Sequence, residues 1–218
     1  MQPNERIFQK LNKETLLSVF RSIGATERSF ENGEVILRQD EPNRKVCFLA
    51  NGKAHAIRVG IDGRVEDYTV LSENRFFGDV LAISENFESP VTIIADTKST
   101  VFSFPYDALL HSEDENAKWL LHYLLSSVAE RFFGLQRRVF YLTRPTLREK
   151  IISYLSDEQK VAGKADFDIP FDRDGLAAYL CCDRSALSRE LSLMQKDGLI
   201  AYKKAHFTLK SRQFAKKD

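Results

Sequence analysis

A regular spacing of apolar residues in the middle of the chain restricts its fold more than any other feature of the sequence. Seven apolar side chains follow at intervals of 4, 3, 4, 3, 4 and 3 residues: Leu121, Leu125, Val128, Phe132, Leu135, Val139 and Leu142. A strict 3.5-residue repeat keeps one apolar seam against a supercoiled partner helix. We therefore predict a long helix that pairs with its copy in a homodimer; the alternative is a single amphipathic helix lying on its own domain.

The region before this helix has the composition of a β-rich domain. Short runs of Val, Ile, Phe and Tyr over residues 26–104 alternate with the turn pairs Asn32-Gly33, Asn51-Gly52 and Asp62-Gly63. Each such pair indicates a hairpin whose two central residues both have positive φ. Many short strands at this spacing predict a β-sandwich or an antiparallel β-roll, related to the jelly roll, after a short helical opening over residues 5–23.

The chain changes character again after the apolar seam. Arg144-Pro145 ends the helix, because the residue before proline is driven out of the helical region. Thr146 and Glu149 fit a capping box, which predicts a new helix to about Leu155 and then a polar loop over residues 157–168. We place the hinge at residues 143–146. The predicted α+β chain thus has a sensor domain (1–112), a dimerisation helix (113–143) and a DNA-binding domain (144–218).

The segment over residues 171–210 has the pattern of a winged helix-turn-helix. Asp172 is placed to cap a short helix, a tight turn follows at Cys181-Cys182, and Asp183 is placed to cap a second helix. Gly198 ends the second helix, and residues 200–202 and 206–209 form two strands of a wing.

This frame predicts which side chains meet DNA. The N-terminal outward residues of the second helix would read base edges in the major groove, and basic residues of the wing would contact phosphates. The candidate DNA-binding residues are Asp183, Arg184, Ser185, Ser188, Arg189, Lys203, Lys204 and His206.

The distribution of charge agrees with a sensor domain followed by a DNA-binding domain. Residues 144–218 hold 15 Lys and Arg against 11 Asp and Glu, whereas the preceding residues hold 17 against 20. The N-terminus has no apolar signal-peptide core and no segment is long enough to span a membrane, so we expect a cytoplasmic protein. The spacings of nucleophilic, P-loop and HExxH enzymes are absent, and Cys47, Cys181 and Cys182 lack metal-site spacing; we expect no enzyme and no metal centre.

The run LAAYLCCDRSALSRELSLMQKDGLI, residues 176–200, resembles the pattern of the Crp/Fnr superfamily, named for the cyclic AMP receptor and the fumarate-nitrate regulator. Gly33, Gly52, Gly63 and the triplet Phe77-Gly78-Asp79 stand where the family's cyclic-nucleotide-binding-like roll has its glycines. The resemblance covers nearly the whole chain. It implies a homodimeric, sequence-specific transcription regulator whose partners are a palindromic double-stranded DNA operator, RNA polymerase and a small-molecule effector.

By family position, the effector pocket would be lined by Phe77, Gly78, Asp79, Val80 and Ser89 of the roll and by Leu135 and Gln136 of the long helix. Cyclic-nucleotide-binding members hold the phosphate with an arginine where this chain has Ser89-Pro90, beside Glu88. A buried phosphodiester needs a paired cation. We therefore expect an effector other than cyclic AMP.

Other departures from the family pattern leave alternatives open. The iron–sulfur members use an N-terminal cysteine cluster that is absent here, and His55, His111 and His122 stand alone. Phe76, Phe77 and Phe87 are bulky enough to fill the pocket, which would give a ligand-independent DNA binder.

Two departures lie in the DNA-binding segment itself. Cys181 replaces a turn glycine, and a thiol sensor using the cysteines is a further alternative. Ser185 replaces a glutamate common in the family. We expect the half-site to keep the guanine read by Arg189 and to differ beside it.

Overall fold

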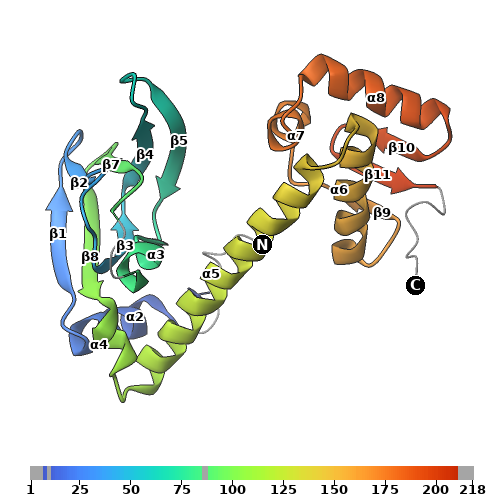
Figure 1. Cartoon of the computed structure of the whole chain (residues 1–218). Coiled ribbons are helices and arrows are strands. Elements are labelled where there is room, and N and C mark those ends of the chain that lie inside the picture. The colour runs from blue at the N-terminus through green and yellow to red at the C-terminus, as the bar shows by residue number, and fades with distance from the viewer. Residues whose placement is uncertain (1–6, 9–10, 85–87, 211–218) are drawn as a thin grey trace. The chain divides into compact units, whose positions relative to one another are not determined.

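The computed structural model describes residues 7–8, 11–84 and 88–210 and has the predicted α+β class. The chain divides into two compact units, one ending at residue 130 and the other beginning at residue 131 (Figure 1). None of the helices in these described ranges is long and apolar enough to cross a membrane.

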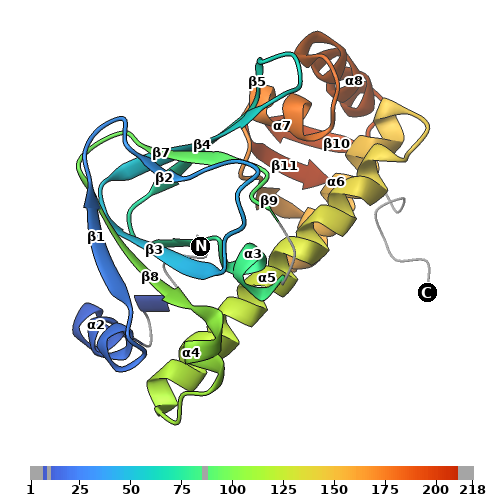
Figure 2. The same cartoon turned by 60° about the vertical axis from the view of Figure 1, so that its left-hand side comes forward.

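The first unit is an antiparallel β-roll, as predicted. One sheet has the strand order β1-β8-β3-β6 and the other the order β2-β7-β4-β5, and the two face each other in Figure 2. The first sheet comprises β1 (Thr26–Phe30), β8 (Ser99–Pro105), β3 (Lys45–Asn51) and β6 (Arg75–Phe77). The second comprises β2 (Val35–Leu37), β7 (Thr92–Ala95), β4 (Lys53–Val59) and β5 (Val65–Ser72).

Strand β3 shows why the roll forms from this sequence. Its successive residues from Val46 to Leu49 are all buried, because both faces of the strand are covered. Cys47 and Leu49 belong to the apolar interior of the roll, whereas Val46 and Phe48 belong to a second core on the outer face. Alternate side chains point to opposite faces of a strand, so one short segment contributes to two cores.

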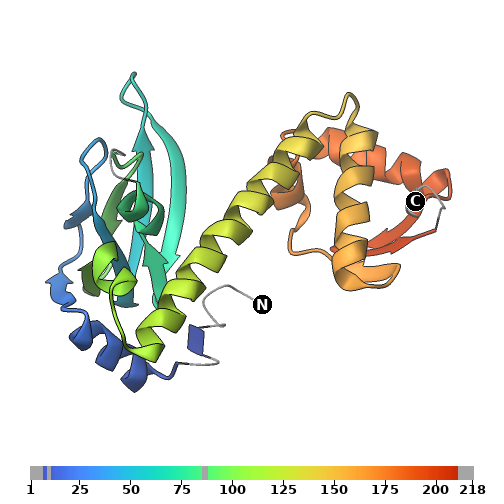
Figure 3. The ribbon, with the colours of Figure 1, turned by 60° about the horizontal axis from the view of Figure 1, so that its bottom comes forward.

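The second core of this unit is formed by helices packed outside the sheet. It joins α2 (Lys13–Ser22), α4 (Tyr106–Leu110) and the first half of α5 (Glu115–Leu142) to the strands, and α2 lies beside the first turns of α5 in Figure 3. A short helix α3 (Asp79–Ile83) follows β6. The predicted helical opening is interrupted at Asn12, since its side chain accepts a hydrogen bond from the backbone N–H of Thr15 and starts α2 there.

Two of the three predicted hairpins are wrong. Only Asp62-Gly63 joins neighbouring antiparallel strands, β4 and β5. Gly33 and Gly52 lie where the chain passes from one sheet to the other. In all three pairs the glycine alone has positive φ, at 85°, 93° and 77° for Gly33, Gly52 and Gly63, so these are not turns with two left-handed residues.

Gly52 has a steric requirement of its own at the sheet crossover. A Cβ there would come within 2.7 Å of the Lys98 carbonyl oxygen. Glycine therefore permits the close approach of the two chain segments as well as the positive φ.

The second unit is a helix-turn-helix packed on a small sheet, as predicted. Its elements after α5 are α6 (Leu147–Ala162), β9 (Asp166–Asp168), α7 (Arg173–Tyr179), α8 (Arg184–Lys196), β10 (Ile200–Lys203) and β11 (His206–Leu209). The capping box of Thr146 and Glu149 is present. The predicted end at Leu155 and the loop after it are wrong, because α6 continues to Ala162 and Gly163 ends it in the left-handed region. The wing has a third strand, β9, which pairs with β11.

Candidate nucleic-acid interface and effector pocket

The helix-turn-helix is formed by α7, a tight turn and α8. The carboxylate of Asp172 accepts a hydrogen bond from the backbone N–H of Gly175 at 2.7 Å, as its predicted capping role requires. Asp183 precedes α8 in an extended conformation, but its side chain makes no capping bond, so that part of the prediction is wrong. Cys181 has a φ of 50° in the turn, a left-handed conformation that glycine adopts with less strain.

The predicted base-reading residues lie together on the first turns of α8. Leu187, Leu191 and Met194 are buried against the rest of the unit. Arg184, Ser185 and Arg189 are exposed and Ser188 is half-buried. The Arg184 guanidinium lies 3.2 Å from a carboxylate oxygen of Asp174. Arg189 makes no ion pair or hydrogen bond with any residue that the structure describes, so its guanidinium is available for a guanine edge.

A salt-bridge pair that the sequence analysis did not identify holds α8 in place. The guanidinium of Arg148 on α6 donates to Glu190 of α8 at 2.5 Å and to Asp197, just after α8, at 2.7 Å. Two charge-assisted hydrogen bonds from one arginine fix the angle of α8 more firmly than one bond does. The carboxylates are 42 and 49 residues away in sequence, which no local pattern links to Arg148.

Two of the three wing residues that are predicted to contact phosphates have exposed side chains. Lys203 and Lys204 are exposed. The Arg173 guanidinium donates to the Lys204 carbonyl at 3.1 Å and lies 5.0 Å from the centre of the Tyr202 ring, so the wing is attached to the start of α7.

His206 is placed differently from the two lysines. Its Nε2 lies 2.7 Å from a carboxylate oxygen of Asp166, and its Nδ1 lies 3.0 Å from one of Asp168. Both carboxylates belong to β9, which the sequence analysis read as loop. Hydrogen bonds that the His206 ring donates to the carboxylates of Asp168 and Asp166 raise the pKa of His206 above its usual value of about 6.5. The phosphate contact predicted for His206 stays a prediction.

The raised pKa of His206 predicts a pH dependence of the wing. A group whose pKa is higher in the folded state stabilises that state below its unfolded pKa and loses the contribution as pH rises through the folded pKa. The melting temperature should therefore fall from pH 6 to pH 9 by more in the parent than in a His206→Gln variant. Two-dimensional NMR titration of the His206 ring checks the pKa directly. A ring pKa at or below about 6.5 would contradict the assignment.

The predicted effector residues of the roll fall into buried and exposed groups. Phe77, Asp79 and Ser89 are buried, whereas Val80 is 51% exposed. The Ser89 hydroxyl donates to the Val91 carbonyl at 2.8 Å. Gly78 has a φ of 70°, and a Cβ there would lie 2.6 Å from the Asn43 amide nitrogen.

The two helix residues of the predicted pocket belong to the other unit. Leu135 and Gln136 are both exposed on α5. Their proximity to the roll stays a prediction.

The interior of the roll is apolar. Phe77 packs there with small and aliphatic side chains of both sheets, among them Ala54, Leu71 and Ile93. Phe76 points to the outer core instead, with its ring centre 4.6 Å from that of Phe48. Phe87 lies outside the described residues. Of the three phenylalanines considered as fillers of the pocket, Phe77 is therefore the one seen in the interior.

The heptad residues of α5 form an exposed apolar stripe. Leu125, Phe132, Leu135 and Val139 are between 45% and 63% exposed, while Leu121, Val128 and Leu142 are half-buried. A second face of the same helix, formed by Ala117, Leu120 and Leu124, is buried in the outer core of the first unit. Helix α5 thus has one apolar face that its own domain covers and another that it leaves open.

The three cysteines differ in exposure: Cys47 is buried, Cys182 is half-buried and Cys181 is exposed. The described ranges contain no group of three or more His, Cys, Asp or Glu side chains able to hold a metal. Burial raises the pKa of the Cys47 thiol to about 12, and burial also raises the pKa of Cys182. A thiol rather than a thiolate predominates at both positions at neutral pH, which lowers their reactivity.

Comparisons with known proteins agree with both units. Residues 27–113 match the model of the cyclic nucleotide-binding domain, and residues 149–213 match that of the Crp-like helix-turn-helix domain. The transcriptional activator protein FnrL of Cereibacter sphaeroides is 24% identical over 184 residues, which cover 80% of this chain and 72% of that protein.

Solved structures share the fold. The OCPA complex of CprK has a TM-score of 0.61 at 14% identity, covering 91% of this chain and 90% of its own. A transcriptional regulator from Thermotoga maritima has a TM-score of 0.51 at 22% identity, covering 59% and 97%. The c-di-GMP-responsive global regulator CLP of Xanthomonas campestris has a TM-score of 0.50 at 18% identity, covering 92% and 100%.

Proposed function

Because the chain belongs to the Crp/Fnr family of DNA-binding transcription regulators, we propose that it acts as a homodimer on a palindromic operator and responds to a small effector other than cyclic AMP. The observation that carries the dimer is the exposed apolar stripe of α5. Four heptad side chains, Leu125, Phe132, Leu135 and Val139, are about half exposed or more in the single chain. A second copy of α5 packed along the same heptads would remove them from water.

The dimer sets the geometry of DNA reading. A two-fold axis along α5 relates two copies of α8, and each copy inserts its N-terminal turns into one major groove. Half-sites then lie about one helical turn apart, about 10 base pairs. In each half-site Arg189 reads a guanine through two hydrogen bonds, and Lys203 and Lys204 contact phosphates.

The proposed class of effector follows from the side chains at residues 88–90, which come after α3 in the sequence. Where cyclic-nucleotide-binding relatives hold the phosphate with the arginine of an Arg-Ser or Arg-Thr pair, this chain has Ser89-Pro90, and the neighbouring Glu88 is exposed. The hydroxyl of Ser89 is already bonded to the Val91 carbonyl. An apolar interior around Phe77 favours an uncharged or largely apolar effector over a cyclic phosphate.

The proposed mechanism is a shift between two states of the dimer. The effector binds in the roll and favours the state whose two α8 helices match the operator spacing. It regulates only in so far as it binds one state more tightly than the other. RNA polymerase is the proposed partner of the DNA-bound dimer.

A ligand-independent DNA binder is the second candidate function. The buried ring of Phe77 in the roll interior favours it, because the chain's own side chain occupies space that an effector would need. A thiol sensor is less favoured at Cys47 and Cys182, because burial raises the pKa of both thiols; Cys181 is exposed.

Selection of bound sites from random DNA, with and without cyclic AMP, tests the proposal. We expect the purified full chain to enrich a two-fold palindrome with half-sites about one helical turn apart, and cyclic AMP to leave the affinity unchanged. A motif that appears only with cyclic AMP would contradict the effector assignment. A single, non-palindromic half-site would contradict the dimer.

A further inference from the structure

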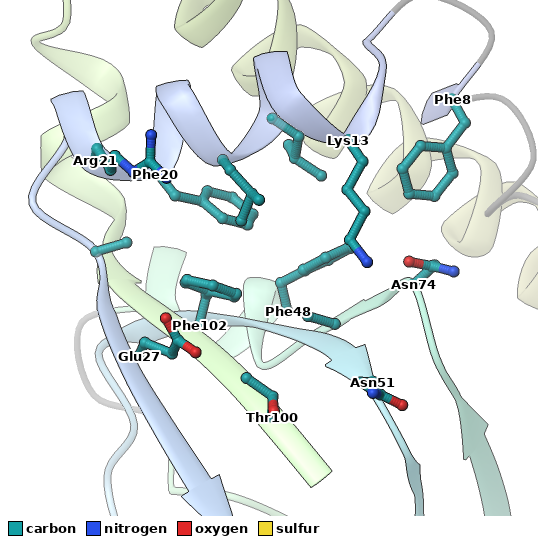
Figure 4. Close-up of a pocket in the computed structure, with 14 residues that line it drawn as sticks. Phe8, Lys13, Phe20, Arg21, Glu27, Phe48, Asn51, Asn74, Thr100 and Phe102 are labelled. Carbon is teal, nitrogen blue, oxygen red and sulfur yellow. The ribbon is translucent and has the colours of Figure 1, made fainter.

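A cavity of about 400 Å³ lies in the first unit, between α2 and the outer face of the sheet that contains β3 (Figure 4). Its strand residues include Phe48, Ala50 and Phe102. On β3 these positions alternate with Cys47 and Leu49, which point into the roll. The cavity is therefore on the opposite side of the sheet from the roll interior where an effector is proposed above.

The floor of the cavity is aromatic. Phe8, Phe20, Phe48 and Phe102 all line it; Phe8 and Phe102 are half-buried, whereas Phe20 and Phe48 are 1% and 3% exposed. The ring centre of Phe20 lies 5.4 Å from that of Phe48 and 5.2 Å from that of Phe102, within the range of favourable ring pairs. The volume falls within the range of about 300–1,000 Å³ found for small-molecule sites, which are mostly apolar with a few polar groups.

Polar groups gather over one end of this floor. Lys13 extends from the start of α2 toward the sheet, in the direction of Asn51 and Asn74 (Figure 4). The side chains of Lys13, Asn51, Asn74 and Thr100 make no hydrogen bond or ion pair with any residue in the described part of the chain. A cation and several amide and hydroxyl groups are thus free to bind a ligand.

The charged residues of the lining make the two ends of the cavity different. Glu27 lines it toward the Arg21 end of α2, away from Lys13 (Figure 4). Arg21 lines the same end as Glu27 and offsets its charge, so the uncompensated positive charge of the lining is that of Lys13, which attracts an anionic group to its end. Asn74 supports the Lys13 end from a fixed position, because it has a φ of 63° and its backbone N–H donates to the Leu49 carbonyl.

We propose that this cavity is a second ligand site, for a small aromatic carboxylate. The ring of the ligand packs against the half-buried Phe8 and Phe102, beside the buried Phe20 and Phe48, and its carboxylate pairs with the Lys13 ammonium and accepts from the amides of Asn51 and Asn74. The site goes beyond the function proposed above and does not depend on an effector in the roll. Since α2 and the first half of α5 share the outer core, occupancy of the site stabilises the base of the dimer helix.

Isothermal titration of the full-length protein with two matched probes tests the proposal. Naphthalene-1-acetate carries the ring and the carboxylate, and naphthalene-1-acetamide has the same ring without charge. We expect the acetate to bind at least about fivefold more tightly than the amide, as one partly exposed ion pair allows. Backbone NMR shifts on adding the acetate should centre on Ala50, Asn51 and Asn74. Shifts centred on Ala54 and Ile93 of the roll interior would overturn the proposal.

Three variants sharpen the test. Lys13→Gln should weaken the acetate about fivefold and leave the amide unchanged, and Ala50→Phe should abolish binding of both by filling the cavity. Lys53→Gln is the matched control, because Lys53 is exposed and does not line the cavity. Absence of heat with either probe, equal loss in Lys53→Gln, or full acetate binding by Lys13→Gln would overturn the assignment. Because Lys13 is exposed, that variant remains informative if Ala50→Phe does not fold.

Discussion

Replacing Phe132 by Asp should convert the proposed dimer into a monomer and lower operator affinity by at least about 100-fold. In the single chain the Phe132 side chain is 55% exposed, so the substitution leaves the fold of each protomer intact. In the dimer the two copies face each other across the heptad seam, and two carboxylates there would be desolvated without a cation. A monomer binds one half-site, and loss of the linked second site lowers affinity by about 10²–10⁴.

Analytical ultracentrifugation and fluorescence anisotropy on the selected operator measure the two effects. Gly134→Asp is the control, because it adds the same charge to the same helix away from the seam, and a Cβ at Gly134 meets no other atom within 4 Å. The control should remain dimeric and bind DNA normally. A Phe132→Asp protein that sediments as a dimer would refute the seam as the dimer interface.

The heptad pattern of α5 predicted one of the two apolar faces of the helix and missed the other. The 3.5-residue repeat identified the stripe that the structure leaves open on α5. It did not reveal the second apolar face, Ala117, Leu120 and Leu124, which packs on the first unit. Leu120 and Leu124 each stand one residue before a seam residue, so a single repeat was visible where two faces overlap. Only the packing of the outer core separates the two roles.

The glycine pairs predicted where the strands end but not which strands pair with each other. Asn32-Gly33, Asn51-Gly52 and Asp62-Gly63 each lie at or between the ends of consecutive strands, and all three glycines have positive φ. Only at Gly63 do the flanking strands pair with each other. At Gly33 and Gly52 the chain crosses between sheets, and the strands pair with residues distant in sequence. Local turn chemistry fixes φ, whereas strand partners are decided by which faces the roll must cover.

The parts of the site that the sequence analysis missed all depend on residues far apart in sequence. Strand β9 was read as loop because three residues with two aspartates have little strand propensity, yet β11 pairs with it. His206 then meets Asp166 and Asp168 across that pairing. The aromatic cavity brings together residues between Phe8 and Phe102, which share no motif. The helix-turn-helix was predictable because the Asp172 cap, the turn and the apolar spacing are contiguous in sequence.

Replacing Arg189 by Ala should lower operator affinity by about 2–6 kcal/mol for the dimer, because each bidentate arginine–guanine contact is worth about 1–3 kcal/mol and there are two half-sites. This corresponds to about a 30-fold to about a 20,000-fold loss. Binding to scrambled DNA should change little. Arg189 is exposed and pairs with no other residue in the described ranges, so the melting temperature should stay within the error of the parent.

Lys204→Ala separates base reading from phosphate contact in the same assay. Lys204 is exposed on the wing, and its loss should weaken operator and scrambled DNA alike. Two phosphate contacts per dimer would be removed, so the slope of log affinity against log salt should become shallower by about 2. Anisotropy titrations at several salt concentrations measure both slopes. Equal loss on operator and scrambled DNA in Arg189→Ala would assign Arg189 to the phosphates and leave the guanine reader of α8 to be sought at Arg184.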